Sequence, residues 1–201
     1  MFRLPSGLEL RHFTAAELDF LYREVYEDRV YLRNGVSLRP GDTVVDVGAN
    51  TGLFTLLASE LVGAGGRVVA LEPLPATFAV LEANVAAHAA WCAGRGQQVC
   101  APVLLNCGAG AEGQDSATFT TYSDSASGWS TMYPDDGEAR VGRALGRVPP
   151  LRPLLRAAGS LYVAGMLSGQ RTWSCRLAPL SAVIREQQLE RIDLLKCWVE
   201  G

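Results

Sequence analysis

Residues 42–54, DTVVDVGANTGLF, constrain the fold more than any other part of the sequence. The run Thr43–Val47 is mostly β-branched and shows no polar alternation, which is typical of a strand buried on both faces of a sheet. Small residues follow from Gly48, and the pattern over residues 52–61 suits a helix. A buried strand that turns through a glycine loop into a helix is typical of α/β folds that bind ligands at the strand ends.

The same alternation of strand and helix continues through the first half of the chain. The patterns predict a buried strand over Arg67–Leu71, a helix over 77–88 and a strand over 103–107. This order implies a parallel sheet with right-handed crossovers. The sequence therefore predicts an α/β fold with a doubly wound, mostly parallel sheet.

Less regular segments divide the chain. Residues 1–40 read as a lead-in, with a short strand over 8–13 and a helix that starts at a capping box of Thr14 and Glu17. The main domain is expected over 41–201, interrupted by an irregular insertion at about 123–170. After the insertion, we expect three further elements, an extended segment, a helix and a strand, over residues 171–177, 180–189 and 192–199.

Composition excludes several classes of partner. The 201-residue chain has a formal net charge of -3 and no block of like charges, which argues against a nucleic-acid partner held by phosphate contacts. No run of about 18 apolar residues predicts a membrane span, and residues 1–13 lack the pattern of a signal peptide. A cytoplasmic protein is expected. The five cysteines and two histidines have no zinc-ligand spacing, so no metal site is expected and the cysteines are expected to be reduced.

A carboxylate at the end of the second predicted strand completes the binding signature. Glu72 is placed there to accept both ribose hydroxyls of an adenosine. NAD and S-adenosylmethionine both carry that ribose, so this feature alone leaves the cofactor open. Asn50 replaces the second glycine of a dinucleotide loop, and the anion of Asp46 suits an ammonium and a sulfonium better than a diphosphate. S-adenosylmethionine is therefore favoured.

Three stretches, VVDVGANTGLFTLLA, VVALEPLPATFAVLEANV and ERIDLLKCWVEG, resemble successive motifs of the FkbM family of S-adenosylmethionine-dependent methyltransferases. The resemblance implies the Rossmann-like class I methyltransferase fold, with seven strands, and methylation of a hydroxyl on a small-molecule, lipid, polyketide-type or sugar acceptor. The implied cofactor contacts run along three strand ends: Asp46, Gly48, Asn50 and Gly52 at the methionine part, Glu72 at the ribose, and Asn106, Cys107 and Gly108 at the adenine. Lys196 and Glu200 are the candidates for catalysis, and Ser130 and Thr131 are candidates for facing the acceptor.

The last motif departs from the family, where it usually reads Lys-Ile-Asp-Val-Glu-Gly. Trp198 stands in place of the aspartate, which removes a carboxylate from the strand end. The resemblance also implies a domain truncated after its fourth core strand, with the C-terminal strands of the family fold missing. An exposed sheet edge carrying Ile192, Leu194 and Leu195 would then favour self-association.

Two further interpretations stay open. The first is a catalytically inactive cofactor-binding relative or a truncated fragment that acts only as an interaction protein. The second, which is less favoured, is a nucleotide-dependent oxidoreductase. His12 and His88 are expected to be solvated or capping residues, and Cys107 and Cys197 to be buried thiols. The arginines within residues 140–156 are expected to lie on a solvated face.

Overall fold

The computed structural model describes residues 1–121, 130–131 and 171–199. It divides into two compact units, Met1–Ala117 with Cys175–Val199, and Thr118–Ser174 with Glu200–Gly201. Of the predicted insertion, only Ser130 and Thr131 lie within the described residues. The expected division into a lead-in and a main domain at residues 40 and 41 stays a prediction.

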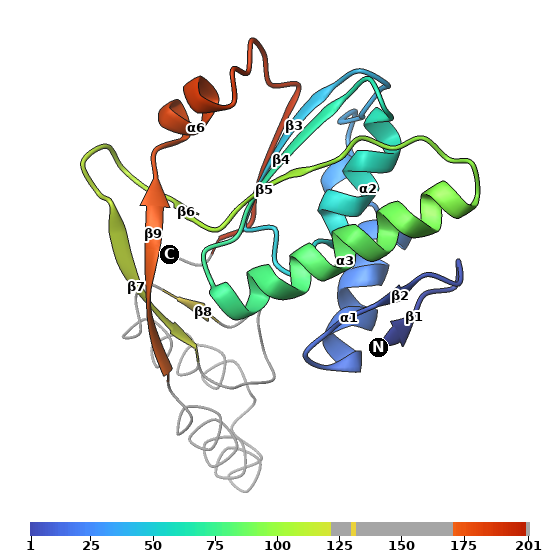
Figure 1. The fold of residues 1–201 in the computed structure, drawn as a ribbon, viewed down its shortest axis with the longest axis horizontal. Helices are drawn as coiled ribbons and strands as arrows, with labels where there is room; N and C mark the ends of the chain where they lie inside the picture. Colours follow the sequence, from blue (N-terminus) through green and yellow to red (C-terminus); the bar gives the residue numbers. More distant parts are fainter. Residues whose placement is uncertain (122–129, 132–170, 200–201) are drawn as a thin grey trace, which may run out of the picture. The chain divides into compact units, whose positions relative to one another are not determined.

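The centre of the first unit is a parallel sheet of four strands in the order β10-β3-β4-β5 (Figure 1). The strands are β3 (Thr43–Val47), β4 (Arg67–Leu71), β5 (Val103–Leu105) and β10 (Leu194–Cys197). Helix α2 (Leu53–Val62) connects β3 to β4, and helix α3 (Pro75–Gly94) connects β4 to β5. The predicted α/β class with a parallel sheet is confirmed.

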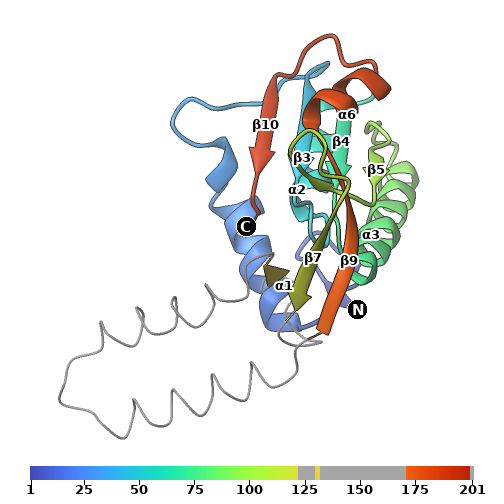
Figure 2. The ribbon, with the colours of Figure 1, turned by 90° about the vertical axis from the view of Figure 1, so that its left-hand side faces the viewer.

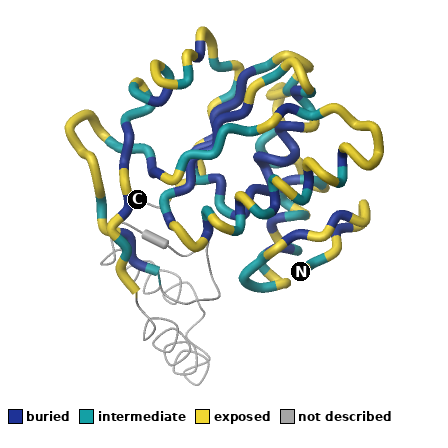
Figure 3. The backbone as a smooth tube through the Cα atoms, viewed as in Figure 1, coloured by how far each residue is buried: buried dark blue, intermediate teal, exposed yellow. Residues whose placement is uncertain are grey.

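Helices cover both faces of this sheet, and the alternation along β3 decides what each face contacts. Val44 packs in one apolar cluster with residues of α2 and of α1 (Ala15–Tyr22). Val45 and Val47 pack in another, with Val183 of α6 (Leu180–Glu186). Figure 2 shows these strands and helices from the side, and Figure 3 shows that the strands at the centre are largely buried. Because side chains alternate along a strand, Asp46 lies on the α2 face beside Val44.

The lead-in packs on the α2 face. Strands β1 (Phe2–Arg3) and β2 (Glu9–Leu10) pair antiparallel, and α1 begins at Thr14, whose side chain accepts the backbone N–H of Glu17. The predicted helix start at Thr14 is therefore confirmed. The chain continues through a π-helical turn, η1 (Arg23–Glu27), and a 3-10 turn, η2 (Val30–Leu32).

Four further strands complete the description. In the first unit, β6 (Gly108–Ala109) pairs parallel with the end of β9 (Arg171–Ala178). In the second unit, the end of β7 (Ser116–Thr121) pairs antiparallel with β8 (Ser130–Thr131).

Predicted boundaries differ where side chains or turns end an element early. The strand predicted over 192–199 spans only Leu194–Cys197, and the Asp193 carboxylate before it accepts the backbone N–H of Thr43 at 2.8 Å. The helix predicted over 180–189 ends at Glu186, shortly before Gln188, whose φ of 50° is left-handed. Within the described parts of the chain, no helix has the length and apolarity needed to cross a membrane.

Candidate functional site

The site lies where the strand order of the sheet reverses. The chain runs from β3 outward to β4 and β5, then returns to place β10 on the other side of β3. Ligands of open α/β sheets bind beyond the carboxyl ends of the strands at such a switch point. Gly48 follows β3 and Trp198 follows β10, and both line a pocket at this edge.

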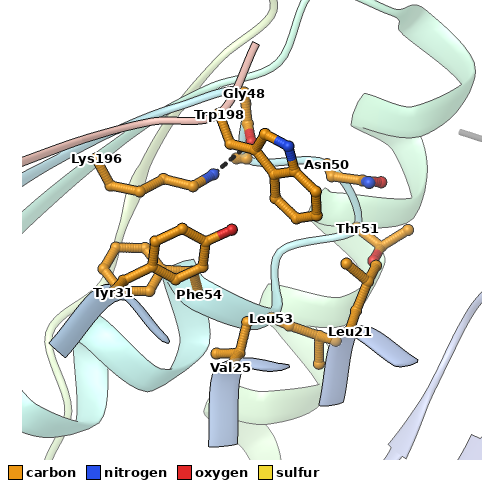
Figure 4. Close-up of a pocket in the computed structure, with 11 residues that line it drawn as sticks. Leu21, Val25, Tyr31, Gly48, Asn50, Thr51, Leu53, Phe54, Lys196 and Trp198 are labelled. Carbon is orange, nitrogen blue, oxygen red and sulfur yellow. Dashed lines mark hydrogen bonds between the residues drawn. The ribbon is translucent and has the colours of Figure 1, made fainter. Parts of the chain in front are cut away.

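The pocket has apolar walls and a few polar groups (Figure 4). Its lining comes from α1 and the two turns after it, from the glycine loop, from the start of α2 and from the end of β10: Leu21, Val25, Tyr31, Gly48, Ala49, Asn50, Thr51, Leu53, Phe54, Lys196 and Trp198.

The glycines of the loop are fixed by close contacts within the protein. Gly48 has a φ of 73°, and a Cβ there would collide with the backbone carbonyl of Trp198. Gly52 has a φ of 96° and caps α2, and a Cβ there would lie 2.6 Å from Cδ1 of Leu81 on α3. The sequence analysis placed both glycines at the methionine part of the cofactor. In the structure, the backbone directly after β10 is the neighbour of Gly48, and helix α3 is the neighbour of Gly52.

Asp46 is fully buried and both of its carboxylate oxygens are engaged. Thr55 Oγ1 donates to Asp46 Oδ2 at 2.7 Å, and Lys196 Nζ forms an ion pair with Oδ1 at 2.8 Å. Lys196 is the register partner of Asp46 across β3 and β10. Lys196 lines the pocket and Asp46 does not, so Asp46 lies on the far side of Lys196 from the pocket. The direct contact with the cofactor that was expected of Asp46 stays a prediction.

Lys196 brings a buried positive charge to the pocket wall. Its Nζ donates to the carbonyl of Gly48 at 2.7 Å, as the dashed line in Figure 4 marks. The rings of Tyr31, Phe54 and Trp198 lie 5.6, 6.0 and 5.9 Å from Nζ, within the range of cation–π attraction. Burial raises the pKa of the Tyr31 hydroxyl, so the phenol stays neutral.

Glu72, directly after β4, fastens the glycine loop. Its Oε2 accepts the backbone N–H of Asn50 and its Oε1 accepts that of Leu74, both at 3.0 Å. The side chain is buried, and this burial raises its pKa to about 7, although both hydrogen bonds and Lys196 oppose the shift. The two halves of the predicted signature, loop and carboxylate, are thus in direct contact.

The residues predicted to border an adenine divide into two groups. The Asn106 amide donates to the carbonyls of Glu72 and Pro73 at 2.8 and 3.1 Å, so it lies beside the ribose-binding candidate. Cys107 is buried in the α6-side cluster, and burial raises the pKa of its thiol. Gly108 is paired in β6. The adenine-bordering role of these residues stays a prediction.

Other candidates lie apart from the pocket. His88 is buried on α3, with Nε2 2.8 Å from Glu60 Oε1, so the expectation of a solvated or capping histidine is wrong. His12 Nδ1 is buried and has no hydrogen-bond partner among the described residues. Cys197 is exposed, so the expectation of a buried thiol fails there. Glu200 and the arginines of 140–156 lie outside the described residues.

Sequence reasoning missed Thr51 and Tyr31. Thr51 Oγ1 is buried and lacks a hydrogen-bond partner among the described residues, while its backbone carbonyl accepts the Asn84 amide. A hydroxyl within a glycine loop is a local signal that could have marked Thr51. Tyr31 has no such signal, since it reaches the pocket through the fold. An orphan hydroxyl in the pocket fits a polar ligand there.

The fold and this pocket define an α/β domain of the class that binds ligands at a strand-order reversal. The sequence model of the "Methyltransferase FkbM domain" family matches residues 46–201, and the chain belongs to that family. Methyltransferases of this kind generally take S-adenosylmethionine as methyl donor.

Two relatives show the range of the similarity. The chain is 55% identical over 86 residues to the 31-O-demethyl-FK506 methyltransferase FkbM of Streptomyces tacrolimicus, covering 43% of this chain and 33% of that protein. It is 35% identical over 210 residues to the AMB antimetabolite synthetase AmbE of Pseudomonas aeruginosa, covering 98% of this chain and 9% of that one.

A third relative, the methyltransferase sdnD of Sordaria araneosa, is 29% identical over 193 residues, covering 92% of this chain and 66% of that protein. The chain thus spans at most about two thirds of the length of these relatives.

Proposed function

We propose that this chain is an S-adenosylmethionine-dependent methyltransferase that acts on a hydroxyl oxygen of a small-molecule, lipid, polyketide-type or sugar acceptor. The observation that carries the proposal is the pocket at the switch point, where the glycine loop meets the end of β10. The likeness to FkbM of Streptomyces tacrolimicus, whose name specifies methylation at an oxygen, supports an oxygen acceptor.

The residues around the pocket divide the binding task. Glu72 would accept hydrogen bonds from the ribose hydroxyls, since each of its oxygens has a second lone pair beyond the backbone N–H that it accepts. Asn106, Cys107 and Gly108 would border the adenine. The cofactor supplies an electrophilic methyl group, so alignment of the acceptor hydroxyl is the main contribution of the protein.

Lys196 is not assigned as the catalytic base. Its Nζ forms the ion pair with Asp46 and donates to the carbonyl of Gly48, so both contacts use this nitrogen as a hydrogen-bond donor. A base must accept the proton of the acceptor hydroxyl.

Calorimetric titration with S-adenosylhomocysteine tests the cofactor. We expect saturable binding by the 201-residue chain, weakened by about 1–3 kcal/mol in Glu72→Ala, the value of hydrogen bonds to a carboxylate. Binding of NAD without binding of S-adenosylhomocysteine would instead support the nucleotide-dependent oxidoreductase.

An inactive relative is the second candidate, because the indole of Trp198 lies at the pocket wall and brings no carboxylate. Turnover of methyl-labelled S-adenosylmethionine with hydroxylated polyketide-type, lipid and sugar acceptors distinguishes the two. Binding without turnover, together with turnover in Trp198→Asp, would support inactivation by this residue.

We also propose that β10, which is an edge strand of the sheet among the described residues, supports self-association. Leu195 is 46% exposed on this edge strand of the sheet, and unprotected apolar edges pair readily. Sedimentation velocity of the wild type and of Leu195→Lys tests this, with a shift to monomer expected in the variant. The cytoplasmic location stays a prediction.

A further inference from the structure

The side chain of Asn84 joins two segments that lie far apart in the sequence. This residue is fully buried on α3. Its Oδ1 accepts the backbone N–H of Arg11 at 2.7 Å, and its Nδ2 donates to the carbonyl of Arg11 at 3.1 Å. The same Nδ2 donates to the carbonyl of Thr51 at 2.8 Å. One buried amide therefore ties the lead-in to the glycine loop.

At the loop, Asn84 is one of two side chains that hold an unusual backbone conformation. Asn50 has a φ of 52°, in the left-handed region that residues other than glycine rarely adopt. Glu72 accepts the backbone N–H of Asn50, while Asn84 donates to the carbonyl of Thr51. The dipeptide is thus held at both ends. A ligand that fixes this part of the loop must also fix the hydrogen bond to Asn84.

At the lead-in, Asn84 holds the peptide from which the chain enters one wall of the pocket. Helix α1 begins shortly after Arg11. Leu21, Val25 and Tyr31 of the lead-in line the pocket together with Thr51 (Figure 4).

Apolar packing against α2 also holds the lead-in, but such packing is non-directional. The hydrogen bonds of Asn84 are directional, so they fix the position of the Arg11 peptide relative to Thr51.

We propose that Asn84 is a positioning residue that couples the glycine loop to the lead-in, so that cofactor binding at the loop fixes the wall formed by Leu21, Val25 and Tyr31. The inference rests on the proposed cofactor. Coupling between two sites is reciprocal, so release of the lead-in from Asn84 weakens cofactor binding in turn. Asn84 is not among the pocket-lining residues and acts only through Thr51 and Arg11.

Amide hydrogen exchange of the wild-type chain tests the coupling, since the N–H of Arg11 donates to Asn84 itself. We expect S-adenosylhomocysteine at about 100 times its Kd to slow exchange at Arg11 about tenfold or more, below a ceiling of about 100-fold for an opening that excludes the ligand. NMR resolves the single amide, and this result does not depend on any variant folding.

The N–H of Arg95 is the control amide. It donates to the carbonyl of Cys92 at 3.0 Å, at the opposite end of α3 from the loop. Helix ends open locally, so its exchange should change less than about twofold when the ligand binds.

Asn84→Ala removes all three hydrogen bonds. We expect it to abolish the slowing at Arg11 and to weaken S-adenosylhomocysteine at least about fivefold in calorimetric titration, at the lower end of couplings between sites. Thr14→Ala is the matched control, because it removes the side-chain cap of α1 and leaves the bonds of Asn84 in place. It should retain both the slowing and the affinity. Cooperative melts show that each variant is folded.

The outcomes separate the inference from the proposed function. Binding of S-adenosylhomocysteine with no slowing at Arg11, or with equal slowing at Arg11 and Arg95, would overturn the inference and leave the proposed cofactor in place. Slowing at Arg11 that persists in folded Asn84→Ala would overturn it as well. Failure of the wild type to bind S-adenosylhomocysteine would overturn the proposed function itself, and the inference with it.

Discussion

Glu72 couples the ionisation of one buried carboxyl group to the position of the glycine loop. Burial raises its pKa from 4.5 to about 7, so the folded chain holds this proton more tightly than the unfolded chain. Its contribution to stability is therefore complete below about pH 4.5 and is lost as the pH rises through about 7.

We expect the free energy of unfolding of the wild type to fall by up to about 3 kcal/mol, relative to Glu72→Gln, between pH 4.5 and pH 8. Urea denaturation of both proteins across this range measures the difference, and other titrating groups cancel in it. A constant difference across the range would show that the Glu72 pKa is not raised.

Gly48 is a second position where one residue decides the local backbone. Gly48→Ala places a Cβ against the Trp198 carbonyl, and we expect it to cost about 1–3 kcal/mol more than a matched substitution in open space. Gly96→Ala is that match, with a φ of 70° and no atom within 4 Å of the added Cβ. Equal losses of stability in thermal melts of the two variants would show that the backbone after β10 moves away from the added Cβ without loss of stability.

The sequence could predict these two positions but not their partners. Gly48 and Glu72 belong to a local pattern of strand, loop and strand end, which fixes where they lie. The Trp198 carbonyl beside Gly48, and Tyr31 beside Lys196, are brought in by the fold from distant segments. No periodicity or spacing encodes such contacts, so local reasoning assigned the space beside Gly48 to a ligand.

Among the elements, β10 is held to β3 by a buried ion pair as well as by its backbone. Lys196→Met would leave the Asp46 carboxylate buried without its counter-charge, and we expect a loss of about 3–5 kcal/mol. Adding Asp46→Asn should recover most of it, because the amide oxygen introduced there can still accept the hydrogen bond from Thr55. Urea denaturation of the two single variants and the double variant measures the coupling, and additive losses would contradict it.

The bounds of the strands were predicted correctly where the apolar pattern alone sets them. They were predicted wrongly where a polar side chain ends the strand early. The bounds of β3 and β4 match the expected runs at both ends, because buried parallel strands are continuous and apolar. β10 is shorter than expected at its start. The carboxylate of Asp193 accepts the backbone N–H of Thr43, the first residue of β3, and Asp193 itself is not part of β10.

For the whole molecule, every described pocket residue belongs to the first unit. The backbone N–H of Leu177 donates to the carbonyl of Asp115 at 2.8 Å, so the two chain segments that leave this unit are adjacent. We expect a chain in which about four glycine and serine residues replace residues 118–174 to bind S-adenosylhomocysteine as the full chain does. Calorimetry on both proteins measures this, and lost binding alongside a retained cooperative melt would show that the second unit contributes to the site.

The place of β10 beside β3 also sets when the site can form during synthesis. Lys196 and Gly48 are 148 residues apart in the chain, and a ribosome adds about 5–20 residues per second. The glycine loop therefore emerges about 7–30 s before the strand that closes the pocket. Until β10 emerges, β3 has no partner strand on that side in the nascent chain. Binding of the cofactor to the nascent chain would therefore indicate that translation has passed β10.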